Sequence, residues 1–235
     1  MTGELEIRTL DSTDEMASVI TVFQQVWGTT TPIVNVELLR AMAHSGGYVA
    51  GAFEHDRLVG ASFGFLARHD GRPALHSHAT GILPGLQHTG VGRSVKLHQR
   101  AWAAARDIEW ITWTFDPIVR RNAWFNIEVL GAHVAEYLVN FYGEMSDSIN
   151  AHDESDRLVV AWPTDPAVPR PVAPDGATTV HVDTPDDIVF LRRTDPNEAM
   201  EWRRRVRKEL GERIDAGATV TGFTRDGQYV LGVVA

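Results

Sequence analysis

The spacing of apolar residues alternates between helix and strand periods along residues 1–162. Residues 5–10 predict a short strand. The helix expected next begins at Ser12, because Glu15 three residues later completes a capping-box pattern. Apolar side chains then recur at helical spacing at Met16, Val19, Ile20, Phe23, Val26 and Trp27.

The same analysis predicts mixed α/β structure up to residue 162. A second helix is expected over residues 35–46, and two strands within 47–68 are joined by a polar turn at His55–Asp56. A strand over residues 74–83, a glycine-rich turn at 87–93 and a helix over 91–107 follow. The next elements are a strand over 108–115, a helix over 119–132 and a strand over 156–162. Hairpin and crossover connections together predict a mostly antiparallel central sheet flanked by helices.

The C-terminal part follows a proline-rich linker. We predict three segments: a main domain at 1–162, the linker at 163–176 and an appendage at 177–235. The appendage has a β-α-β-β pattern, with strands over 178–182 and within 218–234, a helix at about 197–216 and an Asp-Gly turn. The basic run at 203–208 is expected to be a solvated helix face.

Composition excludes several classes of function. A formal charge of −9 argues against general affinity for nucleic acid or phospholipid, and the absence of cysteine excludes disulfides, thiolate nucleophiles and cysteine-ligated zinc. The first residues carry no basic and apolar leader pattern, and the sequence contains no apolar run of membrane-spanning length. We therefore expect a cytoplasmic protein without a membrane partner.

The turn at residues 87–93 is the main candidate for ligand binding. It lies between a predicted strand and a predicted helix, and Gly90 and Gly92 would let backbone N–H groups point inward. The helix start adds partial positive charge, so the turn suits an anion such as a pyrophosphate. A P-loop is excluded because no Lys-Ser or Lys-Thr follows, and the dinucleotide fingerprint fails at Val95.

The pattern Gln87-x-x-Gly90-x-Gly92, preceded by Ile82-Leu83-Pro84, resembles the acyl-CoA-binding turn of the GNAT superfamily of N-acyltransferases. The order of elements over roughly residues 4–162 and the asparagine-led segment 122–132, which ends in leucine and glycine, are similar to that family too. The resemblance implies a GNAT-like fold and transfer of an acyl group from acyl-CoA to a primary amine. A tight turn without a ligand is the alternative.

The resemblance also assigns cofactor contacts. Backbone groups around Ile82 and Leu83 would pair with the pantetheine arm, and Asn122 would contact the pantetheine or the thioester. The pyrophosphate would be held by the N–H groups of Gln87, His88, Thr89, Gly90, Val91, Gly92 and Arg93. Acetyl-CoA or another acyl-CoA, including succinyl-CoA, is the expected co-substrate.

Two histidines are candidates for the general base that an ammonium substrate requires. His76 and His78 alternate along a strand, so with Thr80 they should point to one face. The resemblance favours His76. The alternative is that either imidazole only forms hydrogen bonds within a half-buried sheet.

The general acid departs from the family pattern. Many GNAT proteins have a tyrosine at the position that Ile127 occupies here, so that assignment fails. Tyr137 and Tyr142 lie just downstream, where an aromatic residue is more often part of the core than a catalyst. Tyr142 is the candidate substitute, and otherwise the thiolate leaves unassisted or takes a proton from water. No metal site is expected, because His76 and His78 offer only two imidazoles on one strand.

The acceptor is expected to be a small-molecule amine. Arg120, Arg121 and Arg157 could bind a carboxylate, as in an amino acid or a dicarboxylic acyl group, although surface solvation is the alternative for each. The sequence also resembles a GNAT branch that acylates or succinylates amino acids. A catalytically idle acyl-CoA sensor and a protein N-acetyltransferase remain alternatives, and the appendage could cap the acceptor groove, mediate a homodimer or cover a sheet edge.

Overall fold

The computed structural model describes residues 5–143 and 153–234. The chain forms two compact units, residues 1–112 and 113–235. The unit boundary falls inside strand β5 (Trp110–Phe115). The sequence predicts different boundaries, with a main domain that ends at residue 162 and an appendage that begins after residue 176. That division stays a prediction.

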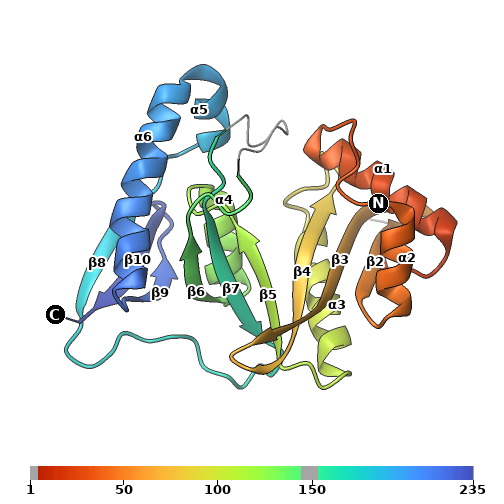
Figure 1. The fold of residues 1–235 in the computed structure, drawn as a ribbon, viewed down its shortest axis with the longest axis horizontal. Coiled ribbons are helices and arrows are strands. Elements are labelled where there is room, and N and C mark those ends of the chain that lie inside the picture. Colours follow the sequence, from red (N-terminus) through yellow and green to blue (C-terminus); the bar gives the residue numbers. More distant parts are fainter. Residues whose placement is uncertain (1–4, 144–152, 235) are drawn as a thin grey trace. The chain divides into compact units, whose positions relative to one another are not determined.

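The first unit is a mixed sheet with helices on both faces (Figure 1). Its strand order is β1-β2-β3-β4-β5, antiparallel from β1 to β4 and parallel between β4 and β5. The elements are β1 (Leu5–Thr9), α1 (Thr13–Trp27), α2 (Val36–His44), β2 (Tyr48–Glu54), β3 (Arg57–His69), β4 (Arg72–Ile82) and α3 (Val91–Ala104). The predicted order and the antiparallel character of the sheet are confirmed.

Two apolar layers hold the helices of this unit to the sheet. Helices α1 and α2 pack on one face, where Phe23 contacts Phe63 with ring centroids 5.8 Å apart. Helix α3 packs on the other face through Val91 and Val95. Helix α1 begins with the predicted capping box, in which Ser12 accepts from the Glu15 backbone and the Glu15 side chain accepts from the Ser12 backbone.

The second unit contains the rest of β5 and the C-terminal elements. Strand β7 lies between β5 and β6, and the C-terminal strands form a separate sheet in the order β8-β10-β9. The elements are α4 (Arg120–Ala123), the π-helix η1 (Trp124–Val129), β6 (His133–Leu138), β7 (Arg157–Pro163), β8 (Thr178–Asp183), α5 (Ile188–Thr194), α6 (Pro196–Val206), the π-helix η2 (Arg207–Gly211), α7 (Glu212–Asp215), β9 (Thr219–Phe223) and β10 (Gln228–Val233).

The appendage has the predicted β-α-β-β order, with the turn between its last strands at Asp226–Gly227. Strand β6 and helix α5 were not predicted. None of the helices among the described residues is both long enough and apolar enough to cross a lipid bilayer.

The prediction that residues 203–208 form a solvated helix face is wrong for Arg203. Its side chain is fully buried and donates to both oxygens of Asp116, at 2.7 and 2.9 Å. It also donates to Asp153 at 2.7 Å, and the buried Arg192 of α5 contacts the same two carboxylates. These four residues, which we call the arginine cluster, join α5 and α6 to the end of β5.

Candidate functional site

The turn between β4 and α3 presents free helix N–H groups. Helix α3 has Gly90 as its N-cap, with φ of 96°, and no side chain caps the helix there. The first backbone N–H groups of a helix have no intrahelical acceptor, so those of Val91, Gly92 and Arg93 need another partner. The geometry therefore suits an anion held by backbone groups.

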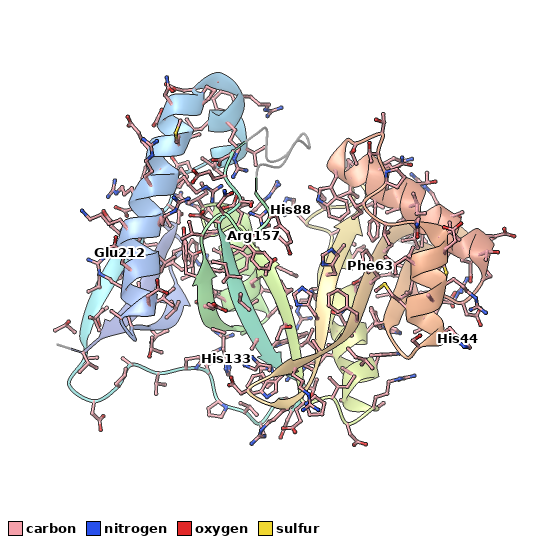
Figure 2. The ribbon with its side chains drawn as sticks, in the orientation of Figure 1. His44, Phe63, His88, His133, Arg157 and Glu212 are labelled. Atoms are coloured by element: carbon pink, nitrogen blue, oxygen red, sulfur yellow. The ribbon has the colours of Figure 1, made fainter. Side chains whose placement is uncertain are left out.

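The glycines of this turn leave open space beside the backbone. A Cβ at Gly90 would meet no atom within 4 Å, and a Cβ at Gly92 would lie 3.8 Å from Ile82. His88, labelled in Figure 2, adopts a positive φ of 69°, and Thr89 donates to the carbonyl of Leu86 at 2.6 Å. The residues present thus fit a diphosphate, which needs several converging N–H donors and no side chain in the way.

Strand β4 pairs with β5 over only a short stretch. Among the described residues the parallel pairs are Ala74–Trp110, Leu75–Ile111 and His76–Thr112. On its other edge β4 pairs with β3 as far as Ile82, and Leu83 donates to the Val59 carbonyl at 2.9 Å. The β5 side of β4 beyond His76 is therefore an edge to which an extended amide chain could add.

A β-bulge interrupts β4 at the histidines. The register with β3 shifts between Phe63–Ala79 and Gly64–Ser77, so His78 has no direct partner on β3. The imidazoles of His76 and His78 lie on one face, with ring centroids 6.0 Å apart, and both contact Phe65. The predicted pairing of the two histidines on one face is therefore observed.

The bulge makes the prediction for Thr80 wrong. Thr80 forms a hydrogen bond with Ser62 at 2.8 Å, and Ser62 accepts from Gln99 of α3. His78 instead contacts Phe63, which packs under α1. Because the extra residue changes the alternation, Thr80 points to the α3 face and His78 to the α1 face.

Both imidazoles are neutral at pH 7. Burial lowers the pKa of His76 to about 4, with further lowering from His78 and from Lys96. His76 Nδ1 lies 3.2 Å from Thr112 Oγ1. His78 is the more exposed of the two, and the part of its ring covered by neighbouring side chains lowers its pKa as well.

Sequence analysis missed a buried polar network behind the bulge. Lys96 Nζ of α3 donates to Ser77 Oγ at 2.8 Å and to Gln99 Oε1 at 3.3 Å, and Gln99 continues to Ser62 and Thr80. Burial lowers the pKa of Lys96 to about 7. We call these residues (Lys96, Gln99, Ser62, Ser77 and Thr80) the Lys96 network. Its only sequence signal is that Lys96 and Gln99 follow Val95 on the sheet-facing side of the predicted helix.

The second unit holds the other predicted site residues. Tyr142 is partly exposed; its hydroxyl lies 3.2 Å from Thr114 Oγ1, and the Arg157 guanidinium lies 5.4 Å from its ring centroid. Arg157, labelled in Figure 2, is buried and donates to the Asp156 carbonyl at 2.8 Å. Burial lowers the pKa of Arg157, and Asp116 opposes that effect.

Residues 120–122, which the sequence analysis also placed in the site, differ from one another in exposure and contacts. Arg120 donates to the Thr184 hydroxyl at 3.3 Å and the Thr184 carbonyl at 2.5 Å, and it pairs with Asp186. Arg121 is exposed, and Asn122 is half-buried in α4. The buried amide of this segment is Asn126, which accepts from the Trp113 indole at 3.2 Å. No group of three or more His, Cys, Asp or Glu residues able to hold a metal occurs among the described residues.

No model of a known protein family matches the sequence, and no curated protein matches it. Solved structures do. An acetyltransferase of the GNAT family from Streptococcus pneumoniae is 14% identical with a TM-score of 0.51, and the match covers 68% of this chain and 99% of that one. The Salmonella typhimurium protein yncA, whose structure includes its cofactor acetyl-CoA, is 14% identical with a TM-score of 0.53, over 72% of this chain and 99% of that one.

A third match is the ribosomal-protein-S18-alanine N-acetyltransferase from Escherichia coli. It is 15% identical with a TM-score of 0.52, and the match covers 74% of this chain and 99% of that one. At such low identities the likeness concerns the fold. The chain has the fold of the GNAT acetyltransferases.

Proposed function

We propose that this protein is an acyl-CoA-dependent N-acyltransferase that transfers an acetyl or succinyl group to a primary amine. The observation that carries the proposal is the combination, within one unit, of the uncapped α3 start and the bulged strand β4. The uncapped start of α3 suits a diphosphate. Strand β4, which precedes it in the sequence, presents His76 and His78 on one face. The GNAT fold supports the same conclusion.

Acyl-CoA would supply the activated acyl thioester. In the proposal, the N–H groups of residues 87–93 bind its diphosphate, and Arg93 adds a charge-assisted contact. The β4 edge at Ile82 and Leu83 orients the pantetheine arm by backbone pairing, and Asn122 contacts the region near the thioester. These residues position the acyl carbon, while the chemistry of proton removal falls to the imidazoles.

The proposed base is a neutral imidazole. An amine must lose its ammonium proton before the nitrogen attacks, and a positioned base typically contributes about 10²–10⁴ in rate. His76 and His78 are both neutral at pH 7, since their pKa values lie below the usual 6.5. His78 is more exposed and therefore reaches the acceptor more readily, whereas His76, with a pKa of about 4, is the weaker base.

The proposed acceptor is a small amine, with an amino acid as the leading class. Arg157 beside Tyr142 and the exposed Arg121 are the residues proposed to recognise a carboxylate, and Tyr142 is the proposed acid for the leaving thiolate. Arg120 is omitted from this set because Thr184 and Asp186 already occupy its guanidinium. We further propose that the protein acts in the cytoplasm.

Calorimetric titration with acetyl-CoA, succinyl-CoA and CoA tests the cofactor site. Gly90→Glu puts a carboxylate at the turn and should abolish binding. Gly71→Glu is the matched control, since Gly71 also has a positive φ and open space around it, but lies in the β3–β4 turn. Loss of binding in both variants, or in neither, would contradict the proposed site.

The idle-sensor alternative is separated from the enzyme by the histidines. The double change His76→Ala, His78→Ala should leave thioester binding intact and lower turnover by about 10²–10⁴. Turnover within a few-fold of the unmodified protein would mean that neither imidazole is the base. Absence of turnover in the unmodified protein with every amine, together with tight thioester binding, would favour the sensor.

A further inference from the structure

The Lys96 network connects the candidate anion turn to the bulge that carries the histidines. Lys96 and Gln99 lie in α3, the helix that begins at Gly90. Their side chains reach Ser77 and, through Ser62, Thr80. Those two β4 residues stand on either side of His78 and Ala79, where the register shifts.

Four of the five members of the network are buried almost completely, and Thr80 is half-buried. Gln99 and Ser62 are fully buried, and Ser77 and Lys96 are 4% and 5% exposed. Hydrogen bonds in such surroundings are shielded from water and fix the geometry of the groups that they join. The network therefore holds both ends of the bulge against the helix whose first turn forms the candidate anion site.

A lysine is an expensive residue at this position if packing alone matters. Burial disfavours the ammonium form, and a methionine of similar length would fill the same space without that penalty. What Lys96 adds is a hydrogen bond to Ser77, the residue between the two histidines, and a positive charge that lowers the pKa of His76. Both effects act on the imidazoles.

We propose that Lys96 is a positioning residue for the reaction, which fixes the bulged segment 77–79 and thereby the imidazoles of His76 and His78 relative to the anion turn. This inference rests on the proposed function. Lys96 contacts the histidine segment from behind the sheet, through Ser77, and acts through that contact.

The experiment compares Lys96→Met and Ser77→Ala with Tyr48→Phe as the matched control. The control removes another hydrogen bond between the sheet and α3, from Tyr48 to His98 at 2.8 Å, without touching β4. Small displacements of catalytic groups can reduce rates by about 100-fold, so we expect kcat to fall by roughly 10- to 100-fold in both test variants while acetyl-CoA affinity is kept. Tyr48→Phe should retain its kcat.

A double variant and a titration separate positioning from general damage. Lys96→Met combined with Ser77→Ala should be no slower than the slower of the two single variants, because both changes remove the hydrogen bond between Lys96 and Ser77. In Lys96→Met, NMR titration should place the His76 pKa above its value in the unmodified protein, whereas Ser77→Ala keeps the Lys96 charge and should not raise it. Unchanged kcat in both single variants, or additive losses in the double variant, would overturn the proposal.

The proposal can be judged separately from the proposed function. Should the unmodified protein show no turnover, backbone amide shifts of residues 76–80 and the imidazole signals still report on the bulge. Lys96→Met must change them more than Tyr48→Phe does. Unchanged signals in Lys96→Met would overturn the positioning role. A clear change in these signals, in a protein that binds no thioester, would overturn only the enzyme assignment.

Discussion

The two units each bury positive charge, and they do so in opposite ways. In the second unit, Arg192 and Arg203 are paired with the carboxylates of Asp116 and Asp153. Burial alone would raise the pKa of Asp116, but the charges of Arg203 and Arg192 bring it well below its usual range. In the first unit, Lys96 donates to the neutral groups of Ser77 and Gln99, and burial lowers its pKa to about 7.

The difference shows what each cluster can do. A guanidinium paired with two carboxylates stays charged over the whole physiological pH range. The arginine cluster therefore holds α5 and α6 in place at every pH in that range. The Lys96 amine, whose pKa burial lowers to about 7, changes its protonation near neutral pH, so the Lys96 network responds to pH. Four measurements would break or sharpen this contrast.

The largest effect is expected from Asp116→Asn. It leaves two buried guanidiniums with only Asp153 as a charged partner in the cluster, and breaking a buried ion pair typically costs about 3–5 kcal/mol. Urea unfolding monitored by circular dichroism measures the loss. A change below about 1 kcal/mol would show that the cluster is no tighter than a surface ion pair.

The next effect is the pH dependence of stability due to Lys96. Its folded pKa of about 7 lies below the ordinary value of 10.5, so the penalty for burying the ammonium is fully present below pH 7 and relieved as pH rises towards 10.5. Relative to Lys96→Met, the unmodified protein should therefore gain up to about 1.4 kcal/mol per pH unit over that window. Parallel stability curves for the two proteins between pH 7 and 10 would refute the lowered pKa.

A smaller effect concerns the acid side of the activity profile. The proposed base is active when neutral, and the pKa values of His76 and His78 lie below 6.5, so kcat/KM should stay level from pH 8 to 7 and fall only below pH 6.5. The pH dependence of kcat/KM for acetyl-CoA and an amine of low pKa measures this. An acid limb centred above pH 7 would point to a different base.

The smallest effect is expected for Arg205→Gln. Arg205 lies in the same basic run as Arg203, yet its side chain is 48% exposed, and its partners Asp183 and Glu209 lie 3.4 and 3.2 Å away. Exposed pairs are worth less than about 1 kcal/mol, so urea unfolding should barely change. A loss similar to that of Asp116→Asn would erase the distinction between buried and exposed members of the run.

Features determined by neighbouring residues were predictable from sequence. The turn at 87–93 was found because glycines between a strand and a helix permit few backbone shapes, and the capping box at Ser12 because both partners lie within one helical turn. The hairpin at His55–Asp56 and the appendage turn at Asp226–Gly227 follow from the same local chemistry.

Features that depend on distant partners were not predictable. Arg203 is buried because Asp116, far away in the sequence, neutralises it, and Lys96 is buried because Ser77 accepts its hydrogen bond. The bulge in β4 places Thr80 on the face opposite to the expected one. Strand β6, which was not predicted, is likewise interrupted by a register shift between Val134 and Glu136. The roles of Asn122, Tyr142 and the arginines in binding stay predictions.

The glycine cap of α3 has a consequence for the lifetime of the protein. An anion bound at this uncapped helix start would bind the folded protein and not the unfolded chain, so ligand occupancy and folding would be thermodynamically linked. At a thioester concentration one hundred times the dissociation constant, this linkage adds about 2.7 kcal/mol to the free energy of unfolding. If the proposed function holds, the abundance of the folded protein in a cell would follow the supply of the proposed thioester through this one turn.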